Sequence, residues 1–395
     1  MSVLPYTHGE KAERIRRVWR GCRLARLLCC LGSLTLLPFG GLAQVADTLA
    51  LPAGLAATPA CDLPCQVVRL LQLWQQRAGI PGVQVAVSVR GQTVLSQGLG
   101  LADVARQLPV TRTTQFRVGS ISKALTSAAL LQLVAEHKLD LDASVQRYVP
   151  GFPLKPYPIT TRELAGHLAG IRHYRPGDVH DANRTDHYTT ATQALTVFAQ
   201  DPLLFPPGTQ FFYSSFGWNL VGAVIEGAAG QPYLRYMQQQ IWLPLGMTHT
   251  YGDRADSLMP NRSRGYQRNG QLIPYDDLSS KYPSGGILST ADDLLLYGNA
   301  LLANRLFSPK LTRLLFTSQT TRAGRPTHYG LGWRVGTSPQ GHRVYWHDGL
   351  VNGGGGYLLL YPDAHVVVAL LTNSRRGHDL PAQALGELFV APPKH

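Results

Sequence analysis

The sequence predicts an α+β fold, in which helices cover one antiparallel sheet built from strands near both ends of the chain. Alternating valines over residues 83–89 have the period of two that is typical of a strand. Strand-like runs return at 343–347, 357–361 and 366–371. The chain between these two groups is rich in proline and tyrosine and has few alternating segments. This pattern indicates a mainly helical insertion between the two groups of strands.

The elements next to these strands are also visible in the sequence. Residues 66–76 are predicted to form a helix, and the Arg-Gly pair at 90–91 turns the first strand into a second one over 93–97. The segment 121–136 is apolar on nearly every side, which predicts a helix buried in the middle of the protein. A closing helix is expected over 381–389.

The N-terminal segment has the three-part layout of a secretory signal peptide. Seven basic residues lie from Lys11 to Arg26, an apolar run follows over 27–37, and small residues end it at Ala43. We expect cleavage near Ala43 and a periplasmic or secreted protein. The alternative is an uncleaved membrane anchor, although the apolar run is shorter than the ~20 residues that a span needs. No stable membrane span is expected after cleavage.

The rest of the chain is predicted to have three parts. These are a linker at 44–65, a sheet-containing α/β domain formed by 66–139 and 285–395, and the mainly helical insertion at 140–284. No internal repeat is visible at periods from 20 to 50 residues.

Composition excludes several classes of function. The whole chain has a net charge of +13, much of which leaves with the basic leader, and no arginine-aromatic cluster indicates nucleic acid. Cys61 and Cys65 could form one local disulfide in an oxidising compartment, and the sequence leaves their pairing open. Two cysteines without a nearby histidine supply too few ligands for a metal site. We also expect that no organic cofactor is required.

Ser120 and Lys123 form a Ser-x-x-Lys motif at the start of the predicted buried helix. Residues three apart share one helix face, so the lysine amine can reach the serine hydroxyl. A lysine in an apolar site loses proton affinity and can accept the serine proton near neutral pH. The helix start also directs N–H groups towards a developing oxyanion. The alternative is that Ser120 only caps the helix and Lys123 is solvated.

Two further motifs are candidates for the same site. Tyr213 begins a Tyr-Ser-Ser motif, and a phenol pushed towards phenolate by a nearby lysine could shuttle protons. His347, Asp348 and Gly349 end a predicted strand, and a glycine there permits close approach of the strand to a substrate. Taken alone, Tyr213 fits the edge of a core and His347 fits the surface.

The order of these motifs resembles the penicillin-recognising serine hydrolases, which comprise class C β-lactamases, D,D-peptidases and related esterases. The resemblance runs from about Gly82 to Asn373 and includes the stretches 116–119, 284–290 and 329–333. Segments at 145–150 and 167–174 are most similar to the branch of the mitochondrial serine β-lactamase-like protein, which is linked to peptide cleavage and forms filaments. The resemblance implies a β-lactamase/transpeptidase-like fold. Self-assembly is therefore an option, but no segment identifies an assembly surface.

Carried onto this sequence, the resemblance implies Ser120 as nucleophile and Lys123 with Tyr213 as the acid/base pair. It also implies an oxyanion hole formed by the N–H groups of Ser120 and Leu350. His347 is included as a fourth catalytic candidate. The residues expected to bind substrate are Ser215, Asp348, Gly349 and Leu350.

Two departures from the family bear on the substrate. Ser215 stands where class C enzymes carry an asparagine, and His347-Asp348 stands where they carry Lys-Thr. Histidine is mostly neutral at pH 7, so the positive charge that would attract a β-lactam carboxylate is missing from this strand. We therefore expect a small-molecule or peptide substrate with a reactive carbonyl, cleaved as a peptide or an ester. The alternatives are a true class C-like β-lactamase and a non-turnover penicillin-binding sensor or scaffold. His167, Arg172 and His173 are expected to serve structure or the cleft wall.

Overall fold

The computed structural model describes residues 61–175, 177–178, 181, 184–254, 261–379 and 381–390, with the side chain of residue 378 left aside. The predicted signal peptide, its cleavage site and most of the predicted linker lie outside these residues. The fold is α+β, as the sequence predicts.

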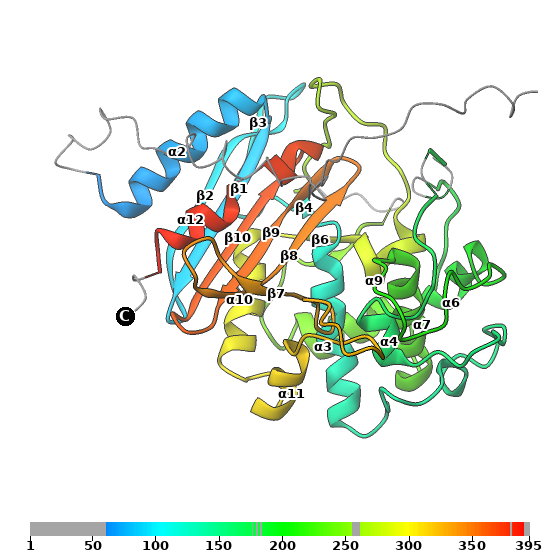
Figure 1. Cartoon of the computed structure of the whole chain (residues 1–395). Coiled ribbons are helices and arrows are strands. Elements are labelled where there is room, and N and C mark those ends of the chain that lie inside the picture. Colours follow the sequence, from blue (N-terminus) through cyan, green and yellow to red (C-terminus); the bar gives the residue numbers. More distant parts are fainter. Residues whose placement is uncertain are drawn as a thin grey trace, which may run out of the picture. The chain divides into compact units, whose positions relative to one another are not determined.

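A seven-stranded sheet with the order β3-β2-β1-β10-β9-β8-β7 forms the centre of the described structure (Figure 1). Every neighbouring pair is antiparallel, and β1 pairs with β10 so that Val83 lies opposite Thr372. The predicted joining of N- and C-terminal strands is therefore confirmed. The short strands β3 and β7 were not predicted. The strands are β1 (Gly82–Val89), β2 (Gln92–Asp103), β3 (Leu108–Pro109), β7 (Arg334–Thr337), β8 (Arg343–Val351), β9 (Gly354–Tyr361) and β10 (Val366–Thr372).

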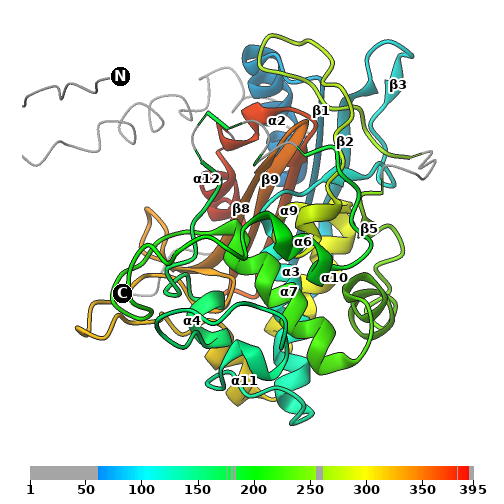
Figure 2. The same ribbon diagram turned by 90° about the vertical axis from the view of Figure 1, so that its right-hand side faces the viewer.

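Helices cover both faces of this sheet, as the two views in Figures 1 and 2 show. On one face, α2 and α12 pack with the strands in one apolar cluster. On the other face, α3, α7 and α10 contribute to a second and larger cluster. The helices are α2 (Leu63–Ala78), α3 (Ile121–Ala135), α7 (Ser215–Ala229), α10 (Ala291–Leu302) and α12 (Ala382–Glu387).

Strand β1 is buried on both faces because it lies in the middle of the covered sheet. Its valines face the cluster beneath α2 and α12, whereas Ala86 belongs to the cluster that contains α3. The alternation between valine and smaller or polar residues thus separates two packed layers. It does not separate core from solvent.

The segment between α3 and α10 contains α7 and several short helices, and it supplies two of the three strands of a small sheet. β4 (Phe116–Arg117), β6 (Ile287–Ser289) and β5 (Tyr251–Gly252) form a second sheet in the order β4-β6-β5. The extent of the predicted insertion stays a prediction. The remaining elements are α4 (Thr161–Ala165), α6 (Ala191–Ala194), α8 (Tyr233–Tyr236), α9 (Tyr282–Gly285), α11 (Pro309–Leu315), the 3₁₀ helices η1 (Val145–Arg147), η2 (Leu195–Val197), η4 (Ser279–Lys281) and η5 (Arg375–Asp379), and the π-helical η3 (Met237–Trp242).

The start of α2 is fixed in two ways. A disulfide joins Cys61 to Cys65, which settles the pairing that the sequence left open. The side chain of Asp62 accepts a hydrogen bond from the backbone N–H of Cys65 at 3.0 Å and caps the helix. Among the described residues, no helix combines the length and the apolar character that a bilayer span requires.

Arg117 holds the strand that leads to the Ser-x-x-Lys motif. Its guanidinium lies 2.6 Å from Asp253, also pairs with Asp276, and donates to the carbonyl oxygen of Asn352 at 2.9 Å. The side chains of the arginine and both aspartates are no more than 9% exposed. These contacts tie β4 to the loop before η4 and to the end of β8.

Replacing Arg117 by methionine is expected to lower the free energy of unfolding by about 3–5 kcal/mol, because two buried carboxylates lose their shared partner. Urea unfolding measures this change. The matched control is Arg112→Met, which removes an ion pair with Asp292 at 2.9 Å from an arginine that is 64% exposed. The control should cost at most about 1 kcal/mol. Equal losses in the two variants would contradict the prediction.

Candidate active site

The chain between β4 and α3 presents Ser120 at the start of the buried helix. Gly119 has a φ of +54°, and a β-carbon on it would lie 2.7 Å from the backbone nitrogen of Leu350. Only glycine fits this left-handed turn against β8. Ser120 occupies the N-cap position, but its side chain makes no capping hydrogen bond. The alternative that Ser120 merely caps the helix is therefore not supported by its geometry.

Lys123 lies one turn later and is fully buried. Its Nζ is 2.9 Å from Ser120 Oγ and 3.1 Å from Ser215 Oγ, and it donates to the carbonyl oxygen of Ser284 at 2.7 Å. The alternative that Lys123 is solvated is wrong. Burial holds the pKa of Lys123 well below its usual range, and the nearby Asp348 opposes this shift only in part. The amine therefore sits beside the hydroxyl in a site that favours its neutral form.

Tyr213 approaches the same pair from the chain before α7. The Nζ of Lys123 lies 4.9 Å from the centre of the Tyr213 ring. Burial raises the pKa of Tyr213 above its usual value, and a hydrogen bond with Ser120 offsets this rise in part. This shift does not favour the phenolate that was expected from the sequence. The site favours a neutral phenol, because burial penalises the charged form.

Strand β8 brings backbone N–H groups to the serine. A β-carbon on Gly349 would lie 1.9 Å from the carbonyl oxygen of Val118 and 3.3 Å from the nitrogen of Ser120. Leu350 follows Gly349 and lines the same hollow as Ser120. The close approach of these two backbones is the arrangement that a pair of oxyanion-hole donors requires.

Gly349→Ala is expected to reduce the rate of acylation by an ester by ~10²–10³-fold, because the added methyl group displaces an oxyanion donor. Stopped-flow acylation measures the effect. Gly151→Ala is the control, since a β-carbon there meets nothing within 4 Å. The Gly151 variant should acylate at the wild-type rate. A normal rate in Gly349→Ala, with the fold intact by circular dichroism, would contradict the assignment of this strand to the oxyanion hole.

His347 does not line the hollow that contains Ser120. Its ring is fully buried, with Nε2 2.8 Å from the Tyr329 hydroxyl and Nδ1 2.6 Å from the carbonyl oxygen of Asp348. Burial lowers the pKa of His347 to about 3. The ring centre lies 6.4 Å from that of Tyr213, so His347 packs behind the phenol as a neutral side chain. This geometry does not support a catalytic role for His347.

Asp348, the next residue on β8, faces the hollow and pairs with Arg334 of β7 at 2.7 Å. The same guanidinium lies 5.9 Å from the centre of the Tyr213 ring. A guanidinium therefore lies beside β8, supplied by the neighbouring strand β7 and paired with Asp348. No motif marks Arg334 in the sequence, and only the pairing of β7 with β8 brings it to the site.

Two histidines fix the turn that carries Tyr213. His167 Nδ1 accepts the backbone N–H of Ser214 at 3.0 Å, and His173 Nδ1 accepts that of Ser215 at 3.1 Å. Burial lowers the pKa of His167 well below its usual value and that of His173 to about 4. His167 also packs against Tyr213 with ring centres 4.3 Å apart. His167 thus serves structure, whereas His173 reaches the wall of the hollow, which agrees with the expectation for both.

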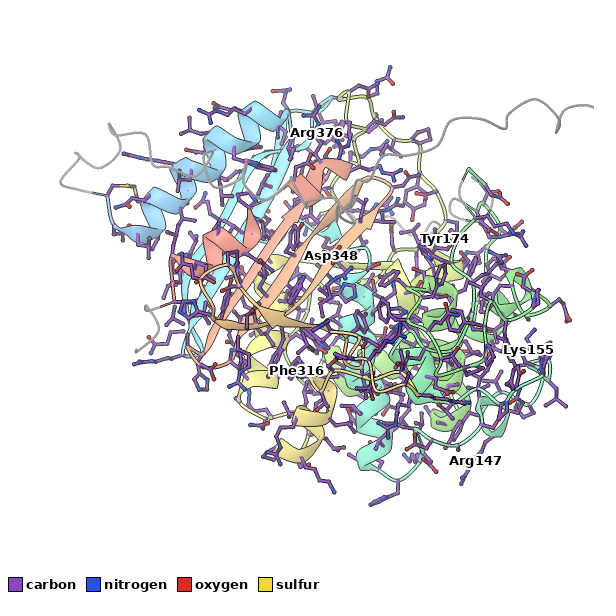
Figure 3. The ribbon with its side chains drawn as sticks, viewed as in Figure 1. Arg147, Lys155, Tyr174, Phe316, Asp348 and Arg376 are labelled. Carbon is purple, nitrogen blue, oxygen red and sulfur yellow. A yellow bond between two sulfur atoms is a disulfide. The ribbon has the colours of Figure 1, made fainter. Side chains whose placement is uncertain are left out.

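These groups surround a hollow of about 310 Å³, called here the active-site hollow. Of the predicted residues, it is lined by Ser120, Tyr213, Ser215, Asp348 and Leu350. Sequence reasoning missed the other cationic and aromatic groups of its wall. Burial lowers the pKa of one of them, Lys281, to about 8. The missed residues are Tyr174, Lys281, Arg334 and Arg375. Figure 3 labels Tyr174 and Asp348, which reach this region from the helical part and from β8.

A buried amine beside a serine, with a phenol and the backbone N–H groups of Ser120 and Leu350 close by, is an arrangement suited to acyl transfer. No group of three or more histidine, cysteine, aspartate or glutamate side chains within the described part of the chain is placed to hold a metal ion. The fold and the arrangement of these residues are typical of the β-lactamase-fold family of serine hydrolases.

Comparisons with known proteins agree. The sequence model of the beta-lactamase family matches residues 67–390. The chain is 36% identical over 303 residues to the serine beta-lactamase-like protein LACTB, mitochondrial, of Homo sapiens, covering 59% of this chain and 55% of that protein. The chain therefore spans about half the length of the curated relatives of this kind that it matches.

Two solved structures have a similar fold. The octameric penicillin-binding protein homologue from Pyrococcus abyssi has a TM-score of 0.70 and 26% identity, with coverage of 81% of this chain and 75% of that one. A D-stereospecific amidohydrolase from Streptomyces sp. has a TM-score of 0.66 and 26% identity, with coverage of 78% and 94%. The chain belongs to the beta-lactamase family and has the β-lactamase/transpeptidase fold.

Proposed function

We propose that this protein is a hydrolase that cleaves peptide or ester bonds through an acyl-enzyme on Ser120. One observation carries the proposal, namely a fully buried lysine amine 2.9 Å from a serine hydroxyl that lines a hollow. A neutral amine at that distance can accept the hydroxyl proton, and burial of Lys123 favours the neutral amine.

In the first step, Ser120 Oγ forms a bond to the substrate carbonyl carbon while its proton passes to Lys123 Nζ. The N–H groups of Ser120 and Leu350 stabilise the oxyanion that results. The bond to the leaving group then breaks, and the leaving group takes the proton from Lys123 through the Tyr213 phenol. A phenol of raised pKa suits this relay, because it gives one proton as it accepts another.

Water releases the acyl group by the same path in reverse. Its proton passes to Lys123 as its oxygen attacks the acyl carbon, and the Ser120 oxygen recovers a proton as the ester bond breaks. Ser215 holds the Nζ of Lys123 at 3.1 Å and so keeps the amine directed at the serine. In this scheme Ser215 orients the base, and Asp348 orients Arg334.

The choice of peptide or ester over β-lactam follows from Ser215 and His347, which replace the residues that class C enzymes use. Arg334 and Lys281 restore positive charge at the hollow, and this observation keeps a β-lactamase as the second candidate. The amidohydrolase from Streptomyces sp. is a structural neighbour whose name denotes cleavage of amide bonds.

The test combines turnover with mass measurement. Purified protein is mixed with a chromogenic ester, a fluorogenic peptide library and a chromogenic cephalosporin, and samples are analysed by intact mass. We expect continued release of ester or peptide product and a transient acyl mass on the protein. A single burst equal to the enzyme concentration would instead identify a non-turnover acyl-binding protein. Turnover restricted to the cephalosporin would identify a β-lactamase.

Export and self-association are further parts of the proposal. The basic and apolar leader at 1–43 supports a periplasmic or secreted location, whereas the human relative is named as mitochondrial. N-terminal sequencing of the protein purified from its source tests cleavage near Ala43. The octameric homologue from Pyrococcus abyssi supports an oligomer, which light scattering after gel filtration measures directly.

A further inference from the structure

The active-site hollow adjoins a second and larger hollow. The second one, called here the outer hollow, has a volume of about 670 Å³ and shares Asn352 and Arg375 with the active-site hollow as lining residues. Its other wall is formed by the segment 267–276. Figure 3 labels Arg376, the residue after Arg375, at the end of the sheet. Because the two hollows meet at two residues, one extended molecule can occupy both.

Arg375 places a positive charge at this junction. Its side chain is exposed and donates a 3.4 Å hydrogen bond to Asn352 Oδ1. Among the residues that the structure describes, no carboxylate lies within 4.0 Å of its guanidinium. The backbone of Asn352 is held in turn by Arg117, which donates to its carbonyl oxygen at 2.9 Å. The junction therefore combines a fixed backbone with a guanidinium that is available to a ligand.

The acidic side chains of the two hollows already have partners. Asp348 in the active-site hollow pairs with Arg334, and Asp276 in the outer hollow pairs with the buried Arg117. Their charges are thus compensated within the protein. Neither carboxylate cancels the charge of Arg375, so the junction favours an anionic group.

The wall of the outer hollow contains a ring that is held in place, Tyr275, and a second guanidinium, Arg268, whose ion pair is exposed. The ring of Tyr275 lies 4.9 Å from the guanidinium of Arg117 and 4.3 Å from that of Arg262, which limits its movement. Arg268 pairs with Asp379 at 3.5 Å, and both side chains are about half exposed or more. An exposed pair of this kind contributes little and can exchange partners.

We propose that the outer hollow is a binding subsite for an acidic group, and that the substrate is an extended peptide with a carboxylate on the part that passes Arg375. A guanidinium binds a carboxylate through two parallel hydrogen bonds, which selects this group over an amide of the same shape. The inference rests on the proposed function for the site of cleavage. The carboxylate belongs either to an aspartate or glutamate side chain or to the peptide's C-terminus, and the experiment separates these sources.

The test uses fluorogenic peptides in matched pairs. One pair differs by glutamate or glutamine at each position in turn beyond the cleaved bond, and the other by a C-terminal carboxylate or carboxamide. We expect wild type to prefer the acidic member of one pair by about tenfold in kcat/KM, as for a hydrogen bond to a charged group. Arg375→Gln should reduce this ratio to below about twofold, and 0.5 M salt should reduce it as well. The control Arg313→Gln, which lines neither hollow, should keep the wild-type ratio.

Binding to Ser120→Ala protein separates the two proposals. Fluorescence anisotropy with the same peptides measures the acidic preference without any cleavage, and the preference should again depend on Arg375. Turnover with equal rates for both members of every pair would overturn the subsite and leave the proposed function standing. A preference that survives in Arg375→Gln would also overturn it. Acidic selectivity in binding without turnover or acyl-enzyme in wild type would support the subsite and contradict the proposed function.

Discussion

Replacing Ser120 by alanine is expected to abolish covalent labelling by a fluorophosphonate and to reduce turnover by ~10⁴-fold or more. The reason is that Ser120 Oγ lies 2.9 Å from the buried Lys123 amine and lines the active-site hollow, as Ser215 also does, but only Ser120 lies at the start of α3 where Gly349 of β8 approaches its backbone nitrogen. Without this oxygen no acyl-enzyme can form, and the remaining groups can only polarise the carbonyl. Intact mass after probe treatment gives the result directly, as the presence or absence of one added phosphonyl group.

Ser122 provides the matched control within the same motif. It is also fully buried, but its Oγ accepts the backbone N–H of Ile287 at 3.3 Å and does not line the hollow. Ser122→Ala should therefore label to the same extent as wild type. Labelling of Ser120→Ala at the wild-type level would show that the probe reacts elsewhere, and the proposed nucleophile would then be wrong.

The architecture was largely predictable from local patterns. The period of two in 83–89 and the strand-like runs near the C-terminus predicted the central strands, and the all-round apolar segment predicted α3. The four-residue strand β7 was not predicted, because so short a run carries no periodic signal and depends on pairing with β8. Burial of both faces of β1 could not be predicted either, since a second covering layer depends on distant segments.

The site likewise contains residues that local sequence predicted and residues that only the tertiary structure brings together. Ser120 and Lys123 were brought together correctly because one helical turn fixes their separation. Arg334 and Lys281 come from distant segments, and nothing in their local sequence marks them. The side chains of His347 and Asp348 were assigned to one site, although neighbours on a strand point to opposite faces. Since Asp348 faces the hollow, His347 has to lie behind it, and strand geometry alone could have shown this.

Replacing Lys123 by methionine is expected to reduce the acylation rate by ~10²–10⁴-fold, because the general base is lost while the volume of the side chain is nearly kept. The pH dependence of wild type should report the same group. Only the neutral amine can accept a proton, so activity falls as pH decreases through the pKa of Lys123. Burial lowers that pKa, and the loss should therefore occur well below the usual lysine range.

Lys281→Met is the control for the pH profile, since burial also lowers the pKa of Lys281, to about 8. If Lys123 is the base, this variant keeps an acid limb, which moves towards higher pH because Lys281 is one of the charges that lower the pKa of Lys123. Loss of the acid limb in Lys281→Met would assign the titration to the wrong lysine and contradict the mechanism. Both variants can be assayed with the same neutral ester over the pH range in which the protein stays folded.

The free energy of unfolding should depend on pH, because the pKa of Lys123 is lower in the folded protein than in the unfolded chain. Between the lowered pKa of folded Lys123 and the unfolded value of about 10.4, the unfolded chain binds more protons than the native protein. The free energy of unfolding of wild type, relative to Lys123→Met, should therefore rise from pH 7 to pH 10. Urea unfolding at both pH values measures the difference. A relative stability that is constant or falls over this range would mean that Lys123 keeps its proton in the native protein and cannot act as the base.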